Sequence, residues 1–137
     1  METLRKNLIA LLSLVVAVGA LSYSAHRNEQ SERNRNIRVA FFEVLKNLGE
    51  LQTLVHYAHY DKDPKAGNPI GGWGRVLLIQ DLAMVLPEPM PTSTRRLFQA
   101  WQGNFAGIGE AEEPTERILA GIRGARGATL EVLKGLR

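Results

Sequence analysis

The chain has 137 residues, of which 45% are hydrophobic, 23% charged and 7% aromatic, and it contains no cysteine. A chain of this length suits one small domain and argues against a multidomain enzyme with a large substrate cleft. Without cysteine there is no disulfide framework, no thiolate nucleophile and no cysteine-ligated zinc or iron–sulfur site.

The excess positive charge is concentrated near the start of the chain. The formal net charge is +3 and the sequence pI is about 9.5. Arg5, Lys6 and Arg27 precede a long remainder, residues 28–137, that is nearly neutral. Affinity for the phosphate backbone of nucleic acids arises from many uncompensated cations. We therefore expect no nucleic-acid partner.

An apolar segment follows the basic start. Residues 8–21 read LIALLSLVVAVGAL, and the uncharged stretch 7–25 has 19 residues. As a helix it would span about 28 Å, close to the hydrocarbon thickness of a bilayer. We predict a transmembrane helix, with residues 1–26 as a membrane anchor and basic side chains that contact lipid headgroups. The residues predicted to flank the membrane are Arg5, Lys6, Arg27 and Arg33.

Two other interpretations of this segment stay open. A cleavable signal peptide has the same order of features, with the small residues at 18–20 as its cleavage site. A buried helix of a soluble core is less favoured, because such helices usually carry a polar stripe. Basic residues lie on both sides of the segment, so the distribution of Lys and Arg does not fix its orientation. We favour an N-terminus inside, because the basic tail would otherwise have to cross the membrane. The rest of the chain would then be periplasmic and the anchor would lie in a bacterial inner membrane.

Residues 27–137 are predicted to be all-α, as an antiparallel four-helix bundle. Apolar residues with 4-3-4-3-4-3 spacing predict a long first helix with one buried seam, as in coiled coils. The turn-forming residues 61–72 end this helix. The seam consists of Ile37, Phe41, Val44, Leu48, Leu51, Val55 and Ala58.

Three further helices are expected. One covers residues 73–86 after a flexible hinge at Gly71 and Gly72, and its mostly apolar surface predicts that it is largely buried. A proline-rich connection then leads to a helix capped by Thr92, Ser93 or Thr94 that ends near Gly107 or Gly109. The last helix is expected to begin near residues 113–114.

Two histidines near the end of the first long helix are candidate metal ligands. His56 and His59 lie three residues apart, and Asp61 and Asp63 follow, so these four could bind zinc or another divalent ion. No His-Glu-x-x-His pattern is present, and structural histidines beside tyrosines are the favoured interpretation. The sequence also lacks the patterns of a nucleophilic catalytic triad, a phosphate-binding loop and a calcium-binding loop. We therefore expect no catalytic activity and no cofactor.

Small residues on the last predicted helix are candidates for helix association. Ala120, Gly124 and Ala128 align at i, i+4 and i+8. Such a strip lets another helix approach closely, either within the same bundle, which is favoured, or from a second chain. Trp73 is interpreted as a core side chain at a helix start, with an exposed anchor for a partner as the alternative.

Four segments carry a resemblance to known proteins: NRNIR at 34–38, FFEVLKNLGELQ at 41–52, GNPIGGW at 67–73 and ERILAGIR at 116–123. In these segments the chain resembles a group of small single-pass membrane proteins of Gram-negative bacteria that have no assigned function. The resemblance implies an anchor and a helical extracytoplasmic body, and no site residues. In outline the chain is also similar to the helical ligand-binding bundles of chemoreceptors, without their second membrane span and signalling part.

These features predict a membrane-anchored helical interaction module. It would be an accessory or scaffold subunit of a cell-envelope complex, or would associate with itself. Its partners would be membrane lipid and either another membrane or periplasmic protein or a second copy. The alternative is a periplasmic sensor or binding domain that holds a small ligand between its helices.

Overall fold

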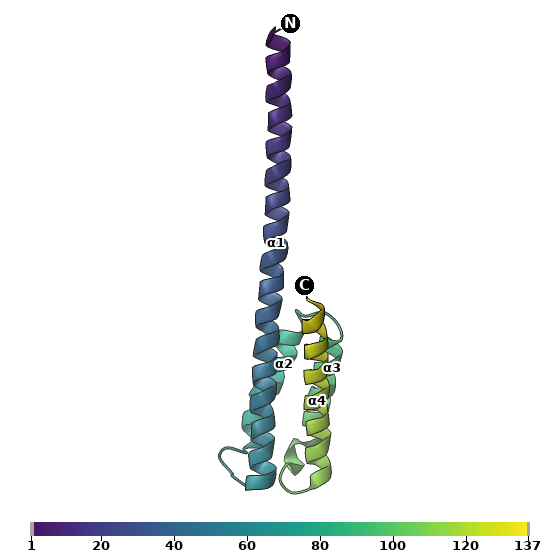
Figure 1. Cartoon of the computed structure of the whole chain (residues 1–137). Coiled ribbons are helices and arrows are strands. Elements are labelled where there is room, and N and C mark those ends of the chain that lie inside the picture. Colours follow the sequence, from purple (N-terminus) through teal and green to yellow (C-terminus); the bar gives the residue numbers. More distant parts are fainter. Residues whose placement is uncertain (1, 137) are drawn as a thin grey trace. The chain divides into compact units, whose positions relative to one another are not determined.

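The computed structural model describes the backbone of residues 2–136 and the side chains of residues 7–136. Within these residues the chain is all-helical and has no strand. The prediction of an all-helical chain with a long apolar N-terminal helix is confirmed. The helices are α1 (Glu2–His56), α2 (Pro69–Ala83), α3 (Met90–Asn104) and α4 (Glu112–Gly135), with a π-helical turn η1 (Tyr57–Asp61) after α1 and a 3-10 turn η2 (Phe105–Gly107) after α3 (Figure 1).

The chain forms two compact units, Met1–Asn36 and Ile37–Arg137, and α1 belongs to both. In the first unit the described side chains of the apolar segment are all exposed, including Leu8 at 69% and Leu21 at 71%. Among the described residues, α1 is the one helix long and apolar enough to cross a membrane, and none of its apolar window is covered by protein. The segment is therefore not a core helix of the described chain.

The second unit, called the body below, has one hydrophobic core to which all four helices contribute. Along α1 the predicted seam faces this core, and Ile37 and Ala58 are partly buried at its two ends. Burying a Leu, Val or Phe side chain contributes about 1.5–3 kcal/mol, so five such side chains contribute on the order of 10 kcal/mol. The seam residues with 0% exposure are Phe41, Val44, Leu48, Leu51 and Val55.

Helix α2 begins at Pro69, four residues before the expected start, and the predicted hinge at Gly71 and Gly72 is wrong. The side-chain oxygen of Asn68 accepts a hydrogen bond from the N–H of Ile70 at 3.0 Å. Proline at the first helical position leaves no amide donor unsatisfied there. A capping side chain and a proline thus start the helix ahead of the two glycines, which lie in its first and second turns.

Gly72 is buried because it faces the ring of Trp101 on α3. A Cβ atom at position 72 would lie 2.2 Å from both Cζ2 and Cη2 of that ring. Trp101 is itself 0% exposed. The glycine therefore provides the space in which the largest core side chain fits between α2 and α3.

The prediction that the second helix is largely buried is wrong for its outer face. The inner face contributes Val76, Ile79 and Ala83 to the core. Leu77 and Leu78 on the outer face remain 45% and 43% exposed. No described element of this chain covers that outer face, although its side chains are apolar.

Helix α3 begins at Met90, so the prediction that Thr92, Ser93 or Thr94 caps it is wrong. The carboxylate of Glu88 accepts from the hydroxyl of Thr92 at 3.1 Å and from its N–H at 3.4 Å. Thr94 lies inside the helix, where its buried hydroxyl donates to the carbonyl of Met90 at 3.0 Å. An acidic side chain that precedes the helix thus satisfies an amide of its first turn.

Helix α4 starts close to its predicted position, and one of its faces is buried in the core. Its first turn contains Glu112 and Glu113, which interact favourably with the positive end of the helix dipole. Ile118, Ile122 and Thr129 are each 0% exposed. The hydroxyl of Thr129 donates to the carbonyl oxygen of its own helix four residues earlier, at 2.7 Å, which satisfies this polar group inside the core.

Two glycines pack against Ala58 in η1, the turn that follows α1. A Cβ atom at Gly67 would lie 2.4 Å from the nitrogen of Ala58, and one at Gly109 would lie 2.6 Å from its carbonyl oxygen. Gly109 also has a φ of +85°, which non-glycine residues rarely adopt. The amine of Lys62 donates to the carbonyl of Gly109. The loop after α1 and the loop before α4 are therefore both fixed to the same point.

Candidate functional site

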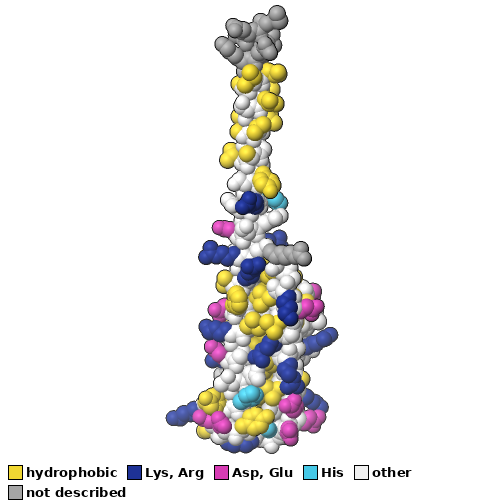
Figure 2. Space-filling view, in the orientation of Figure 1, with side chains coloured by type: hydrophobic (Ala, Val, Ile, Leu, Met, Phe, Trp, Pro, Cys, Tyr) yellow, Lys and Arg dark blue, Asp and Glu magenta, His cyan; other side chains and the backbone are white. Residues whose placement is uncertain are grey.

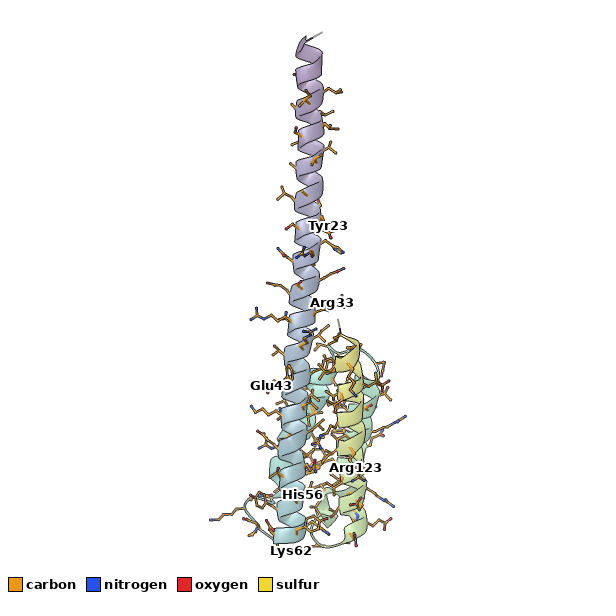
Figure 3. All side chains as sticks on the ribbon, viewed as in Figure 1. Tyr23, Arg33, Glu43, His56, Lys62 and Arg123 are labelled. Atoms are coloured by element: carbon orange, nitrogen blue, oxygen red, sulfur yellow. The ribbon has the colours of Figure 1, made fainter. Side chains whose placement is uncertain are left out.

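The histidines of the candidate metal site have other neighbours in the structure. The Nδ1 atom of His59 lies 3.3 Å from the hydroxyl of Thr115 on α4. The rings of His56 and His59 both meet Tyr60 edge to face, at centroid distances of 5.6 and 4.7 Å. In Figure 3, His56 is labelled near the end of α1, close to Lys62. Among the described residues, no group of three or more His, Cys, Asp or Glu side chains is arranged to hold a metal ion.

Asp63 has a local structural role. Its carboxylate accepts hydrogen bonds from the N–H groups of Lys65 at 2.8 Å and Ala66 at 3.0 Å. These two bonds, that to Ala66 first, hold the pKa of Asp63 below its usual value. The remaining carboxylate of the group, Asp61, is exposed. The four candidates therefore do not converge on one point.

Trp73 belongs to an aromatic cluster on the core. Its half-buried ring meets Phe105, Phe98 and Trp101 edge to face, at centroid distances of 5.3, 5.8 and 6.5 Å. Edge-to-face pairs of this kind stabilise a core by about 0.5–1.5 kcal/mol beyond burial. This placement accounts for Trp73 as a packing residue that joins α2 to α3.

The strip of small residues on α4 lies partly on the surface. Ala120 and Gly124 are exposed, whereas Ala128 is 7% exposed and belongs to the core. The closest approach to α3 is made by a neighbour, Gly121, whose Cβ would lie 3.2 Å from Cα of Leu97. The sequence pattern thus identified the correct region of α4, but not Gly121, the glycine that contacts α3.

Ala120 and Gly124 line a groove of about 370 Å³ between α3 and α4. Small side chains form much of its surface, and the guanidinium groups of Arg96 and Arg117 border it. Arg117 pairs with Glu113 on its own helix, while Arg96 makes no ion pair with any described residue. Guanidinium groups bind carboxylates and phosphates well. This groove suits an acidic side chain more than a purely apolar one.

A larger groove of about 620 Å³ runs between α1 and α2. Glu50 on α1 and Arg75 on α2 form an ion pair within it. Thr53 and Tyr57 add hydroxyl groups, and Gly49 opens the wall because nothing lies within 4 Å of its Cβ position. This groove combines apolar walls with polar groups, as small-molecule sites do.

Large apolar side chains are exposed on the outside of the body. Figure 2 shows apolar side chains between charged ones on its visible face. Soluble monomers rarely expose extended apolar patches, and larger ones mark interaction sites. The exposed members on the part of α1 within the body, on α2 and on the turn after α2 are Val39, Phe42, Ile70, Leu77, Leu78, Met84 and Val85.

The residues predicted to flank the membrane are only partly within the described structure. Arg27 and Arg33 on α1 are exposed. Arg5 and Lys6 lie outside the residues whose side chains are described. The described arginines are therefore accessible to lipid headgroups or to solvent.

No known protein family, no curated protein and no solved structure matches this chain. The functional proposals that follow therefore rest on its own residues.

Proposed function

We propose that the chain is a non-catalytic, membrane-anchored helical module that binds another protein or a second copy of itself. One observation carries the proposal: both units expose large apolar side chains that no described part of the chain covers. In the first unit these side chains surround a helix of membrane-spanning length. In the body they include Leu77 and Leu78 on the outer face of α2, whose inner face contributes to the core.

The body is proposed to be an antiparallel four-helix bundle. In support, the chain reverses direction at each of the three connections between its four helices within residues 37–137 (Figure 1). The buried seam of α1 and the buried face of α4 also repeat every three to four residues, as in such bundles.

The anchor is proposed to lie in the inner membrane of a Gram-negative bacterium, with the body in the periplasm. The support is the basic pair Arg5 and Lys6 directly before the uncharged stretch 7–25, an order of features that is typical of an uncleaved signal anchor. A reporter fusion at the C-terminus tests the orientation. Alkaline phosphatase activity is expected there, and fluorescence of fused green fluorescent protein would contradict it.

The proposed role is that of an accessory or scaffold subunit of a cell-envelope complex, or of a self-associating module. The test is purification of the C-terminally tagged chain from its native membranes in mild detergent after light cross-linking. Mass spectrometry identifies co-purifying proteins, and the mass of the intact complex gives its stoichiometry. A stoichiometric partner, or a defined multiple of the chain, is expected. Recovery of the monomer alone would contradict the proposal.

Exposed positions allow a matched control for this experiment. A Leu77→Ser/Leu78→Ser variant removes apolar surface from the outer face of α2 without touching the core. Replacing the exposed polar residues Gln99 and Gln102 on α3 by serine is the control. Loss of the complex in the α2 variant alone assigns binding to that face. Equal retention in both variants would remove the face from the proposal.

The groove between α1 and α2 favours a second candidate function, a sensor that binds a small polar ligand. Glu50 and Arg75 supply opposite charges, and Thr53 and Tyr57 supply hydroxyl groups along its length. Ligand-dependent increase of the melting temperature of the full chain, lost in a Glu50→Gln/Arg75→Gln variant, would support it. No increase across a metabolite library would count against it.

A further inference from the structure

The outer face of α4 carries a row of exposed residues with a regular spacing. Seven positions from 113 to 134 follow one another at 4-3-4-3-4-3 spacing, and all seven residues are exposed. This spacing places them in one line along the helix, on the side away from the core. The charged members of this outer row are Glu113, Arg117, Glu131 and Lys134, and the small members between them are Ala120, Gly124 and Gly127.

The charges of the outer row are arranged symmetrically about Gly124. Arg117 lies seven residues before this glycine and Glu131 lies seven residues after it. Glu113 and Lys134 lie further out on the two sides, eleven and ten residues away. Positions at corresponding distances from the centre therefore carry opposite charges.

This symmetry makes the outer row complementary to an identical row that runs in the opposite direction. Antiparallel pairing about Gly124 would place Glu131 of each copy against Arg117 of the other, and Lys134 against Glu113. Parallel pairing would place each charge against the same charge, which is unfavourable. The order of charges thus selects both the partner, a second copy of this chain, and the direction of its helix.

Contacts within the body leave these charges available. Glu131 and Lys134 make no ion pair with any described residue. Arg117 pairs with Glu113 on its own helix, but both side chains are exposed, and such a pair contributes little to stability. Off the row, Glu116 and Arg123 pair with each other at 3.3 Å.

The groove between α3 and α4 adds a second cation beside the outer row. Arg117 and Arg96 both line this groove, whose lining residues include no carboxylate. Helix α3 contributes Arg95 and Arg96 and has no acidic residue. A carboxylate that enters the groove would meet two guanidinium groups. Glu131 of a second copy, placed opposite Arg117, supplies such a carboxylate.

The centre of the outer row allows close approach. Nothing lies within 4 Å of the Cβ positions of Gly124 and Gly127, so the packing of the body does not require glycine at either site. Glycine is less favourable than alanine inside a helix. A second helix backbone that passes over this point would make use of the missing side chains.

We propose that α4 packs antiparallel against α4 of a second copy, with a two-fold axis at Gly124 and ion pairs between Arg117 and Glu131 on both sides of it. The same surface serves both copies, so the assembly closes as a dimer. This inference rests on the proposed self-association and assigns it to α4, not to the outer face of α2. It concerns residues of the body alone.

Because the chain has no cysteine, single introduced cysteines can test the direction of pairing in the full chain. The variants Gly124→Cys, Arg117→Cys and Glu131→Cys are oxidised with copper phenanthroline in mild detergent micelles, where the two anchors impose no common orientation on the bodies. Position 124 would meet its own copy at the axis. Position 117 would lie about 10 Å from the axis, so its two copies would be about 20 Å apart. A disulfide requires Cα atoms within about 7 Å of each other.

The expected result is a cross-linked dimer for Gly124→Cys and none for Arg117→Cys or Glu131→Cys alone. A mixture of the last two variants should form a cross-linked dimer. Gly103→Cys on α3 is the control, because Gly103 is also exposed, has open space around its Cβ position and lies off the row, so no cross-link is expected. Cross-linking of Arg117→Cys with itself, or none at position 124, would overturn the proposal.

The mass of the unmodified chain in the same micelles separates this inference from the proposed self-association. A dimer of the unmodified chain without a cross-link at position 124 would overturn the α4 contact and leave self-association intact. A monomer would overturn both.

Exchange of the charges tests the ion pairs themselves. Arg117→Glu and Glu131→Arg should each lose the dimer, because each places like charges opposite one another. A mixture of the two variants should regain it, because every pair then has opposite charges again, and a folding defect would not be rescued in this way. Arg123→Glu is the matched control, with the same change of charge on the same helix but off the row. A mixture that stays monomeric, or loss of the dimer in the control, would overturn the pairing of Arg117 with Glu131.

Discussion

Replacing Gly72 by alanine tests the packing of α2 against α3 most directly. The new methyl group would lie 2.2 Å from two ring atoms of Trp101, whereas ordinary contacts begin at 3.4 Å. The ring is 0% exposed, so it cannot swing into solvent to relieve the overlap. Overpacking of a core costs about 1–3 kcal/mol, and an overlap of this size belongs at the upper end. Alanine regains about 1 kcal/mol of helix propensity. The expected net loss of unfolding free energy is about 2 kcal/mol.

Gly74 offers the matched control two residues further along the same helix. Nothing lies within 4 Å of its Cβ position, so Gly74→Ala receives the propensity gain without the overlap. The two variants should therefore differ by about 3 kcal/mol, because the propensity term cancels in the comparison. For a body of about 100 residues this corresponds to melting temperatures more than about 10 °C apart.

The assay is thermal unfolding of the full chain in detergent micelles, followed by far-UV circular dichroism. A Trp101→Phe exchange removes the two ring atoms concerned and also the indole N–H, which is buried without a hydrogen-bond partner. In a double-mutant cycle, Gly72→Ala should therefore be less harmful in the Trp101→Phe background. Equal melting temperatures for Gly72→Ala and Gly74→Ala would refute the described packing of α2 against Trp101.

Three further measurements test other parts of the body. Gly109→Ala should destabilise the body by more than about 1 kcal/mol, because Gly109 has a φ of +85° and a Cβ atom there would lie 2.6 Å from the carbonyl oxygen of Ala58. The control is Gly103→Ala, which has open space around its Cβ position and should be neutral or stabilising in the same melting assay. Leu51→Asp should lower the unfolding free energy by several kcal/mol and abolish the cooperative melting transition, because it places a charge in the fully buried seam. The control is Thr53→Asp at an exposed site. A Leu51→Asp transition equal to that of the control would contradict the burial of the seam. The pKa of Asp63 is lowered in the folded state, so its contribution to stability is present above the usual pKa and is lost as the pH falls through the lowered value. The Asp63→Asn variant should therefore have a lower melting temperature than the unmodified chain at neutral pH, and this difference should shrink below about pH 4. A difference that does not depend on pH would contradict this role of Asp63.

The helical periodicity of the sequence was sufficient to predict which side of α1 faces the core of the body. The 4-3 spacing from Ile37 to Ala58 identified the buried face of α1, because an amphipathic helix must place these positions on one side. The proline and glutamates near the start of α4 marked its first turn for a similar reason. Both signals are local, so they require no knowledge of the tertiary neighbours.

The errors occurred where a distant residue determines the local structure. Two consecutive glycines suggest a hinge, but Gly72 is helical and buried because Trp101, 29 positions later, needs the space. The cap formed by Asn68 was a local signal that could have corrected the start of α2. The start of α3 was misplaced because Glu88, outside the helix, bonds Thr92 in its first turn.

The surface features were less accessible to sequence reasoning than the core. Ala120 and Gly124 were singled out by their spacing, and they do line a groove. The opposite wall of that groove comes from α3, and no sequence pattern connects Arg96 with Arg117. Likewise, apolar residues around all sides of α2 suggested burial, because the sequence does not show that only one side of this helix meets the core.

The core of the body is completed only by the final helix, and this has a consequence for biosynthesis. The hydrogen bond between Arg38 and Leu136 joins residues 98 positions apart, and α4 covers the same core as the seam of α1. During translation the seam therefore emerges before α4 and lacks this neighbour until α4 has been synthesised. Until α4 is in place, the apolar seam is open to non-native contacts. A chain that terminates before α4 would therefore expose the apolar seam of α1 and be prone to aggregation, and would not form a shorter folded protein.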